Sequence, residues 1–343
     1  MGTPLDPFVP RPSLRNGHWM TLYSWGNPRY FPRLPNPTIR YFDVDHDARV
    51  LAHCHWHKRP WEHPTIIALH GLNASSRAHY MRGIASKAFA QGINVIRLNQ
   101  RNCGSTEHLS AGLFHSGLTA DAKFVIDELA SVDGLPDIAV AGYSLGGNLA
   151  LKLAGEYGDR PPAVLRAVAA VSPILELSLC VHALERRENV LYEWNFVRGL
   201  KRRMRRKNRL WPGRFDMSKL PSIRTVRAFD DAYTAPHFGF KDAEDYYHRA
   251  SAMRVVDRIR VPTLVITAQD DPFVPSEPFC DPRVTDNSTI TLHLCRHGGH
   301  CGFIGTRDGR DDGYWAEKRI VEFVKASLDN RTIEERDLQT TGA

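Results

Sequence analysis

Short apolar runs alternate with longer amphipathic stretches along much of the chain. The apolar runs predict strands at Val50–Trp56, Thr65–Leu69, Ile93–Leu98, Ile138–Gly142, Val168–Val171, Pro262–Thr267 and Thr289–Leu294. The amphipathic stretches predict helices at Arg77–Gln91, Leu118–Leu129, Leu145–Tyr157 and Trp315–Leu328. Nearly continuous apolar strands that alternate with helices are typical of a parallel sheet with helices on both faces. We therefore expect an α/β fold with a mostly parallel, doubly wound sheet.

This alternation is interrupted between Glu176 and Arg254, where the pattern becomes helical and amphipathic. Apolar side chains recur there near helical spacing at Leu191, Trp194, Phe196, Val197, Leu200 and Met204. We predict that they face away from the basic side chains of the same stretch. We interpret residues 176–254 as a helical cap, inserted over the carboxyl edge of a core formed by residues 46–175 and 255–330.

The two ends of the chain differ from this core. The first forty residues are rich in proline and aromatic residues, a composition that favours an extended segment wrapping a domain and not a helix. We assign residues 1–45 to this wrapping segment. The last residues are polar, and we assign residues 331–343 to a frayed tail.

The composition excludes several classes of protein. The chain has 343 residues, of which 42% are hydrophobic, so it is too apolar to be disordered. No apolar run approaches the roughly 18 residues of a membrane span, and Met1 to Pro12 lacks the apolar core of a secretory signal. Six cysteines are too few for a disulfide scaffold. We expect a globular cytoplasmic protein with reduced thiols.

The net charge of +7 is concentrated in one segment. Nine basic residues and no acidic one lie between Arg198 and Arg214, which leaves 36 basic against 38 acidic residues elsewhere. An amphipathic basic helix suits an anionic membrane surface or an anionic ligand, which would make the protein peripheral at the inner membrane surface. The candidate contacts are Lys201, Arg202, Arg203, Arg205 and Arg206.

An alternative remains open for the basic segment, namely a solvated cap helix whose apolar face packs on the domain. Nucleic acid is not an expected partner, because no recognised nucleic-acid-binding module accompanies the charge.

One motif points to nucleophilic catalysis. The run Gly142-Tyr143-Ser144-Leu145-Gly146 fits G-x-S-x-G, and it lies between a predicted strand and a predicted helix, as the motif requires. The two glycines permit a sharp turn that holds the serine Oγ at the edge of the sheet. A serine hydroxyl becomes a good nucleophile only when a base removes its proton. Ser144 is therefore the candidate nucleophile, and a base must be found elsewhere.

The candidate base is His300, which follows the last predicted strand. Asp270 and Asp271 compete for the acid that would orient its imidazole. Asp271 stands three residues beyond the strand-end Ala268, the usual turn spacing, so we prefer it; Asp270 would instead cap the loop. The chain order Ser, acid, His is one of the known orders of such triads.

A second strand end supplies candidate oxyanion donors. His70-Gly71-Leu72 follows the predicted strand Thr65–Leu69. We assign one donor to the Leu72 backbone N–H and the other to the Leu145 N–H, at the start of the helix after Ser144. Such donors stabilise a tetrahedral oxyanion by a few kcal/mol each.

With these motifs the chain resembles the YheT-like branch of the α/β-hydrolase superfamily, the AB hydrolase-4 or ABHD1/2/3-type group. The resemblance rests on stretches spread over nearly the whole chain: Pro7-Phe8, Leu14–His18, His70–Leu72, Tyr80–Gly83, Leu98–Gly104, Phe114–Thr119, Asp121, Gly142–Asn148, Asp270–Phe273 and Gly299-His300. It implies an α/β-hydrolase fold with a helical cap and the hydrolysis of carboxylic esters, with lipid-like acyl esters as substrates. It also implies Ser144 as nucleophile, Asp271 as acid and His300 as base.

Two other functions remain as alternatives. An alcohol that replaces water would make the protein an acyltransferase, and a hydrolase fold without activity would serve as a ligand- or membrane-binding protein.

We expect no cofactor and no metal. Two groups of side chains resemble metal ligands: Cys295, His297, His300 and Cys301 near one another in the sequence, and His53, His55 and His57 on one predicted strand. The first group lacks a second pair of ligands. We interpret the second as an exposed or wet strand face, because alternate residues of a strand share a side.

Overall fold

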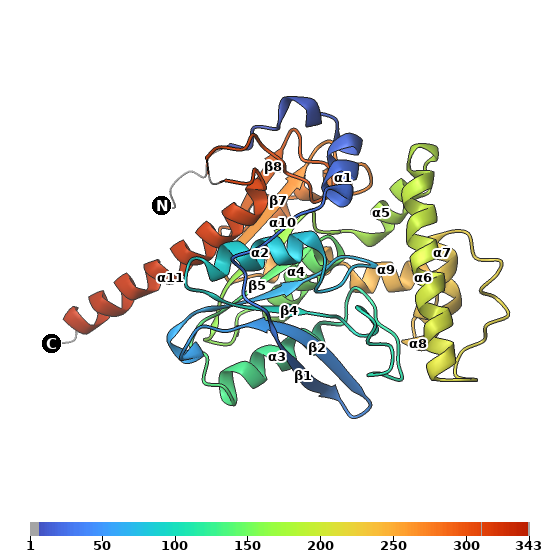
Figure 1. Cartoon of the computed structure of the whole chain (residues 1–343), viewed down its shortest axis with the longest axis horizontal. Coiled ribbons are helices and arrows are strands. Elements are labelled where there is room, and N and C mark those ends of the chain that lie inside the picture. The colour runs from blue at the N-terminus through green and yellow to red at the C-terminus, as the bar shows by residue number, and fades with distance from the viewer. Residues whose placement is uncertain (1–6, 310, 342–343) are drawn as a thin grey trace.

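Eight strands form one sheet in the computed structural model, which describes residues 7–309 and 311–341 (Figure 1). The strands are β1 (Thr38–Asp45), β2 (Ala48–His55), β3 (Thr65–Leu69), β4 (Asn94–Leu98), β5 (Ile138–Tyr143), β6 (Leu165–Val171), β7 (Thr263–Ala268) and β8 (Ile290–Cys295). Their order in the sheet is β1-β2-β4-β3-β5-β6-β7-β8. All pairs from β4 to β8 are parallel, whereas β1 and β2 form an antiparallel edge. The predicted mostly parallel α/β sheet is confirmed.

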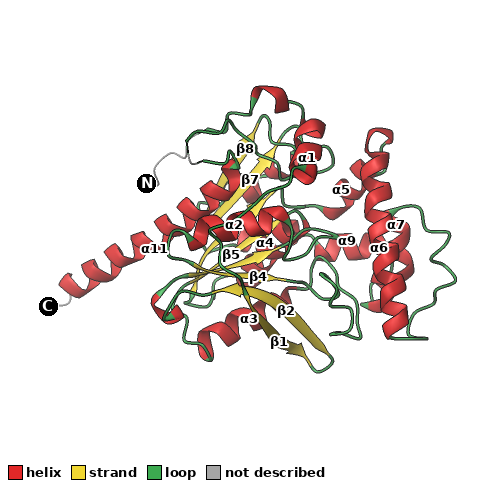
Figure 2. Cartoon of the chain, viewed as in Figure 1, coloured by secondary structure: helices red, strands yellow, loops and turns green. Residues whose placement is uncertain are grey.

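Helices cover both faces of this sheet (Figure 2). One face packs on α2 (His79–Phe89) and the first part of α11 (Trp315–Thr341), and the other packs on α3 (Thr119–Ser131) and α4 (Leu145–Tyr157). The central strands β3, β5 and β7 are buried along their whole length, which explains why their sequences are nearly continuous apolar runs. The carboxyl ends of these strands carry the predicted site residues.

The N-terminal segment differs from the prediction. Residues 17–26 form α1 (Gly17–Gly26), and β1 lies inside the segment that we expected to be extended. No proline interrupts this stretch, and the Asn16 side chain caps the helix by accepting from the Trp19 N–H at 3.1 Å. A Cβ at Gly17 would lie 1.8 Å from the Asp270 carbonyl oxygen, so α1 packs closely on the loop after β7. Residues 1–6 lie outside the described residues.

The C-terminal end also differs from the prediction, because α11 continues as a helix to Thr341 instead of ending in a tail at residue 331. Residues 342–343 lie outside the described residues. Within the described ranges, no helix combines the length and the apolarity that crossing a bilayer requires.

Helices occupy the chain between β6 and β7, which we call the insertion, and they gather at the end of the molecule opposite to α11 (Figure 1). They are α5 (Leu177–Leu184), α6 (Val190–Leu210), α7 (Val226–Phe229), α8 (Ala235–His237) and α9 (Ala243–Ala250), with a π-helical turn at Asp230–Thr234; the short α10 (Pro282–Thr285) lies between β7 and β8. Asn148 of α4 joins the insertion to the core, since its amide donates to the Ser116 and Ala250 carbonyls and accepts from the Ala252 N–H.

The predicted apolar face of α6 is partly wrong. Val197, Leu200 and Met204 are buried against the core, but Leu191 and Trp194 are 76% and 58% exposed. Because α6 advances about 100° per residue, Leu191 and Trp194 share a stripe with the exposed Arg198, Arg202 and Arg205 and not with the buried residues.

A buried ion pair anchors the loop that follows β4. Arg101 donates to Asp121 of α3 from Nε at 2.8 Å and from Nη2 at 2.6 Å, and 8% and 9% of the two side chains are exposed. A weaker contact of 3.3 Å joins Arg101 to Asp45. The next residue of the loop, Asn102, contacts Lys207 of α6 at 2.7 Å. The pair therefore supports the part of the core on which the insertion rests.

Asp121→Asn should destabilise the fold by about 3 kcal/mol, because it leaves a buried guanidinium without its main counter-ion. Urea unfolding followed by circular dichroism measures the change. Glu128→Gln on the same helix is the matched control. Glu128 pairs with Arg40, but 23% and 24% of these side chains are exposed, so the loss should stay below about 1 kcal/mol. Equal losses in the two variants would contradict the role of burial.

Candidate active site

Ser144 occupies a strained turn between β5 and α4. Its backbone has φ 55° and ψ −120°, a conformation that non-glycine residues rarely adopt. A Cβ at Gly142 would lie 2.0 Å from the Gly146 carbonyl oxygen, and a Cβ at Gly146 would lie 2.4 Å from the Leu69 carbonyl oxygen. Both glycines of the motif are therefore required for the chain to turn so sharply against β3. The Ser144 side chain lies at the carboxyl end of β5, as the motif predicted.

His300 and Asp271 form a buried pair. His300 Nδ1 and Asp271 Oδ2 are 2.9 Å apart, and the Asp271 side chain is wholly buried. The other carboxylate oxygen accepts from the backbone N–H groups of Phe273 and Val274 at 3.1 and 3.0 Å. These bonds orient the carboxylate toward the imidazole.

The neighbouring Asp270 has different partners. Its Oδ1 accepts from the Gly299 N–H at 2.9 Å, and its Oδ2 lies 3.3 Å from His297 Nδ1. Asp270 thus ties together the loops that follow β7 and β8, while Asp271 contacts His300. Of the two carboxylates, the structure brings Asp271, which the sequence favoured, to the predicted base.

The loop that carries His300 adjoins Ser144 through the end of β6. The Ser144 N–H donates to the Val171 carbonyl at 2.9 Å, and the Cys301 N–H donates to the Ser172 hydroxyl at 3.0 Å. The two predicted residues therefore flank the same strand end.

The first helix supports His300, a role that the sequence did not indicate. The His300 N–H donates to the Thr21 hydroxyl of α1 at 2.8 Å. Phe273 lies over the imidazole with ring centroids 4.2 Å apart and also contacts Tyr192 of α6 at 5.3 Å. Tyr192 in turn is 3.2 Å from His18 of α1. The local signals for α1 were the Asn16 cap and the proline-free stretch after it.

The surroundings of His300 favour its protonated form. Burial alone would lower its pKa, but the Cys301 sulfur and the Asp271 carboxylate stabilise the imidazolium, and together they raise the pKa from 6.5 to about 10. An imidazole in this environment holds an accepted proton well.

His70 in the predicted oxyanion loop (His70–Leu72) is buried and hydrogen-bonded, and its surroundings favour the neutral imidazole. His70 is fully buried, its Nδ1 bonds to the Gly71 carbonyl at 2.8 Å, and its Nε2 accepts from the Gln100 N–H. Burial lowers the pKa of His70 to about 4. Leu145 is the first residue of α4, so its N–H has no acceptor within the helix. Leu72 and Leu145 both line one cavity.

This cavity of about 90 Å³ lies between the edge of the sheet and the insertion. Most of its wall is aliphatic or aromatic. Leu72 and Leu145 contribute from the core, and side chains of α5, α6 and α7 contribute from the insertion, among them Leu177, Val181, Leu200, Met204 and Phe229. Such a cavity suits an apolar group attached to the reacting carbonyl.

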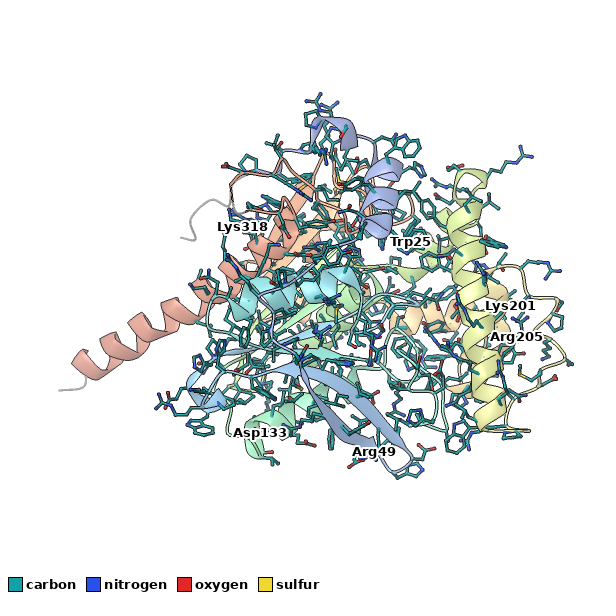
Figure 3. The ribbon with its side chains drawn as sticks, viewed as in Figure 1. Trp25, Arg49, Asp133, Lys201, Arg205 and Lys318 are labelled. Carbon is teal, nitrogen blue, oxygen red and sulfur yellow. The ribbon has the colours of Figure 1, made fainter. Side chains whose placement is uncertain are left out.

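The five basic residues predicted as membrane or anion contacts separate into different environments. Lys201 donates to the Pro221 and Ile223 carbonyls at 3.1 Å, and Arg206 binds the buried Glu107 at 2.8 Å. Arg203 contacts Asn73, whereas Arg202 and Arg205 are exposed. Figure 3 shows Lys201 and Arg205 on α6 and Trp25 on α1.

The residues that resembled metal ligands have other partners. His297 and His300 contact Asp270 and Asp271. The interpretation of the second group as an exposed or wet strand face is wrong for His55, which is buried. His53 and His57 are half-buried, and the His57 ring stacks on Phe89 of α2 at 4.0 Å.

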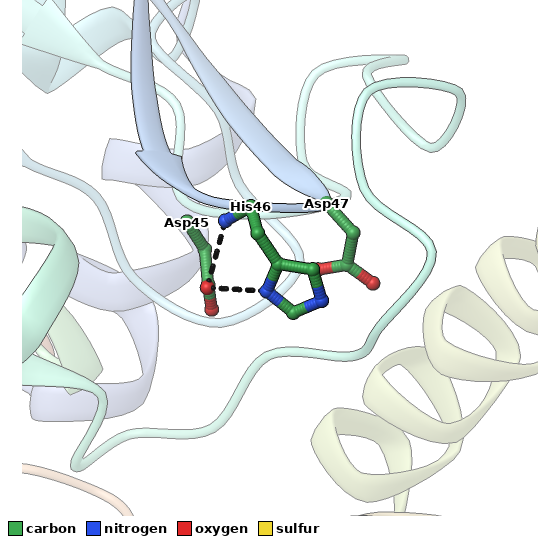
Figure 4. A group of neighbouring side chains, drawn as sticks. All are labelled: Asp45, His46 and Asp47. Carbon is green, nitrogen blue, oxygen red and sulfur yellow. Dashed lines mark hydrogen bonds and ion pairs between the residues drawn. The ribbon is translucent and has the colours of Figure 1, made fainter.

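One further acidic group stands out among the described residues. Asp45, His46 and Asp47 lie close together at the exposed turn between β1 and β2 (Figure 4). Asp45 contacts His46 at 2.9 Å and Arg101 at 3.3 Å, and Asp47 is 3.9 Å from Arg214. Both carboxylates already lie near cationic side chains, so we assign no metal site to this turn.

Comparisons with known proteins agree with the fold and the motifs. A model of the alpha/beta hydrolase family matches residues 66–309. YheT of Escherichia coli (strain K12), which carries an esterase name, is 31% identical over 331 residues, which cover 95% of each chain. Phospholipase ABHD3 of Mus musculus is 28% identical over 275 residues, or 78% of this chain and 64% of that protein.

Among solved structures, the Pyrococcus furiosus esterase Pf2001 is similar in fold, with a TM-score of 0.57 at 16% identity over 87% of this chain and 98% of that chain.

The raised pKa of His300 can be measured directly. In ¹⁵N-histidine NMR spectra, His300 should remain protonated at pH 8, and Asp271→Asn should move its pKa back toward 6.5. Because the folded pKa exceeds the unfolded one, this group stabilises the fold fully below about pH 6.5 and loses that contribution as pH rises through about 10. A wild-type pKa below 6.5 would refute the assignment of charge around His300.

Proposed function

We propose that this chain, which belongs to the alpha/beta hydrolase family and to its YheT-like branch, hydrolyses carboxylic esters through a triad of Ser144, His300 and Asp271. The observation that carries the proposal is the 2.9 Å pair of His300 and Asp271, buried beside the strained turn that presents Ser144. A buried imidazole with a fixed carboxylate partner next to a serine is the arrangement that makes a hydroxyl nucleophilic.

Each group then has one task. Ser144 Oγ attacks the acyl carbonyl while His300 Nε2 takes its proton, and the Nδ1–H bond to Asp271 keeps the imidazole in the correct tautomer. The Leu72 and Leu145 N–H groups stabilise the oxyanion. His300 returns the proton to the leaving alcohol, and water then cleaves the acyl-enzyme by the same route. Because the base must be neutral to accept the proton, turnover rises with pH through the pKa of His300.

The lining of the cavity supports lipid-like acyl groups as substrates. Its wall is mainly aliphatic and aromatic, and Leu72 and Leu145 of the oxyanion loop and α4 form part of it. An acyl chain bound to Ser144 would therefore extend under the insertion, where its burial contributes about 0.8 kcal/mol per methylene. The phospholipase name of the Mus musculus relative agrees with this substrate class.

The exposed stripe of α6 supports a peripheral contact with an anionic membrane. Leu191 and Trp194 stand in line with Arg202 and Arg205, and the Arg198 guanidinium lies 5.3 Å from the Trp194 ring. Tryptophan beside arginine is the composition of surfaces that lie at the lipid–water boundary. Lys201 and Arg206 bind the protein itself and are no longer candidates for this contact.

Active-site labelling tests the triad. Wild-type protein should react with a fluorophosphonate probe and Ser144→Ala should not, because the probe forms its covalent bond with an activated serine. Asp271→Asn should lower kcat for p-nitrophenyl butyrate by about 10³–10⁴-fold, since the imidazole loses its orienting partner. Asp270→Asn is the matched control and should cost far less. Equal labelling of Ser144→Ala, or a larger loss from Asp270→Asn, would refute the assignment.

Filling the cavity tests the acyl site. Val181 of α5 lines the cavity, while Leu179 of the same helix is 41% exposed and does not. Val181→Phe should lower kcat/KM for p-nitrophenyl octanoate at least tenfold more than for the acetate, because the added ring occupies space that only the longer chain needs. Leu179→Phe should leave that ratio as in wild type. A parallel loss on both esters would place the acyl chain elsewhere.

A further inference from the structure

We propose that Arg203 forms an anion subsite beside the oxyanion loop, where its guanidinium receives a phosphate or carboxylate group carried by the ester substrate. The inference rests on the proposed function, because it places a charged part of the substrate in the same cavity as the acyl group. Arg203 lines that cavity together with Leu72 and Leu145, the two predicted oxyanion donors.

Asn73 holds Arg203 in position. Asn73 follows Leu72, has φ 58°, and its side chain contacts α6. Its amide donates to the Phe196 carbonyl at 2.8 Å, and its Oδ1 accepts from Arg203 Nη2 at 3.2 Å. A Cβ at Gly199 would lie 2.4 Å from the Asn73 amide nitrogen, so this glycine lets α6 approach the loop. Gly199 marks the closest approach of α6 to this loop, and Arg203 lies one helical turn further along α6, where Asn73 holds its guanidinium.

Arg203 lacks a counter-ion, in contrast to Arg206, and it has fewer hydrogen-bond acceptors than Lys207. Arg206 binds Glu107, and the ammonium group of Lys207 donates to Asn102 Oδ1 and to the Glu107 and Ser110 carbonyls. Within residues 7–309 and 311–341 no carboxylate lies within 4.0 Å of Arg203, whose guanidinium donates there to the neutral Asn73 amide oxygen. Asp230 also lines the cavity, but its carboxyl group accepts from the Thr234 and Tyr247 hydroxyls.

This arrangement selects an anionic ligand. A guanidinium has five N–H donors in a planar fork that matches phosphate and carboxylate oxygens. In a half-buried position against an apolar wall, the unpaired charge is costly until an anion pairs with it. The field of Arg203 reaches the oxyanion loop, since it adds to burial in lowering the pKa of His70. An ester with a nearby anionic group would thus gain binding without displacing any protein partner.

A pair of soluble esters tests the subsite. The substrates are 1-butyrylglycerol and 1-butyrylglycerol 3-phosphate, which share an acyl group and differ in one phosphate. Arg203→Gln should lower the ratio of kcat/KM for the phosphorylated ester to that for the neutral ester by about 10–100-fold, the usual effect of losing a hydrogen bond to a charged group. Arg203→Lys should recover part of that ratio. Arg209→Gln, an exposed arginine on the same helix, should leave the ratio as in wild type.

Inorganic phosphate distinguishes a substrate-borne anion from a free one. Calorimetry with phosphate alone measures binding to wild type and to Arg203→Gln without any turnover. Weaker binding or none in the variant supports the subsite, even where neither ester is hydrolysed and the proposed ester hydrolysis itself fails. A second outcome is that phosphate alone competitively inhibits hydrolysis of the neutral ester while the enzyme shows no preference for the phosphorylated ester. Arg203 would then bind a free anion, and the proposal of an anion carried by the substrate would be overturned. An unchanged ratio together with unchanged phosphate binding overturns the proposal.

Discussion

The left-handed backbone of Ser144 is the constraint on which the rest of the site depends. A non-glycine residue in such a conformation costs of order 1–3 kcal/mol and persists only where its surroundings leave no alternative. Here the surroundings are the two glycines of the turn, which let β5, α4 and the end of β3 approach more closely than any side chain would permit. The same turn places the first N–H of α4 beside the loop after β3. The proposed nucleophile and the proposed oxyanion donors are thus positioned by the same backbone packing.

The cavity is formed jointly by the core and the insertion. The core carries the proposed reacting groups at the ends of its strands, while the wall that an apolar substrate would contact belongs largely to α5, α6 and α7. Polar contacts connect these two parts at fixed points, through Asn73, Asn102 and Asn148. These contacts join residues that lie more than a hundred positions apart in the sequence, so the position of the insertion over the core depends on long-range hydrogen bonds.

The sequence predicted the parts of the molecule whose signals are local. Buried parallel strands appear as apolar runs, and the turn at Ser144 appears as paired glycines between a strand and a helix, so the sheet and the positions of Ser144 and His300 follow directly. Asp270 and Asp271 are adjacent in the sequence; the turn spacing favoured Asp271, and in the structure Asp271 is the carboxylate that contacts His300. The support from Thr21 was missed, because a proline-rich composition hid the short helix that carries it.

The basic segment shows why a local sequence pattern cannot predict the environment of each charged side chain. Its cations are similar in sequence but differ in their environments: Lys207 contacts neutral oxygen atoms, Arg206 binds a carboxylate, and Arg202 is exposed. Each of these environments satisfies a charge in its own way. Arg203 is half-buried against an apolar wall with one neutral partner, so its desolvation is not compensated within the described residues. The proposed binding of an anion at the cavity therefore depends on the electrostatic free energy of Arg203 and not on the net charge of the segment.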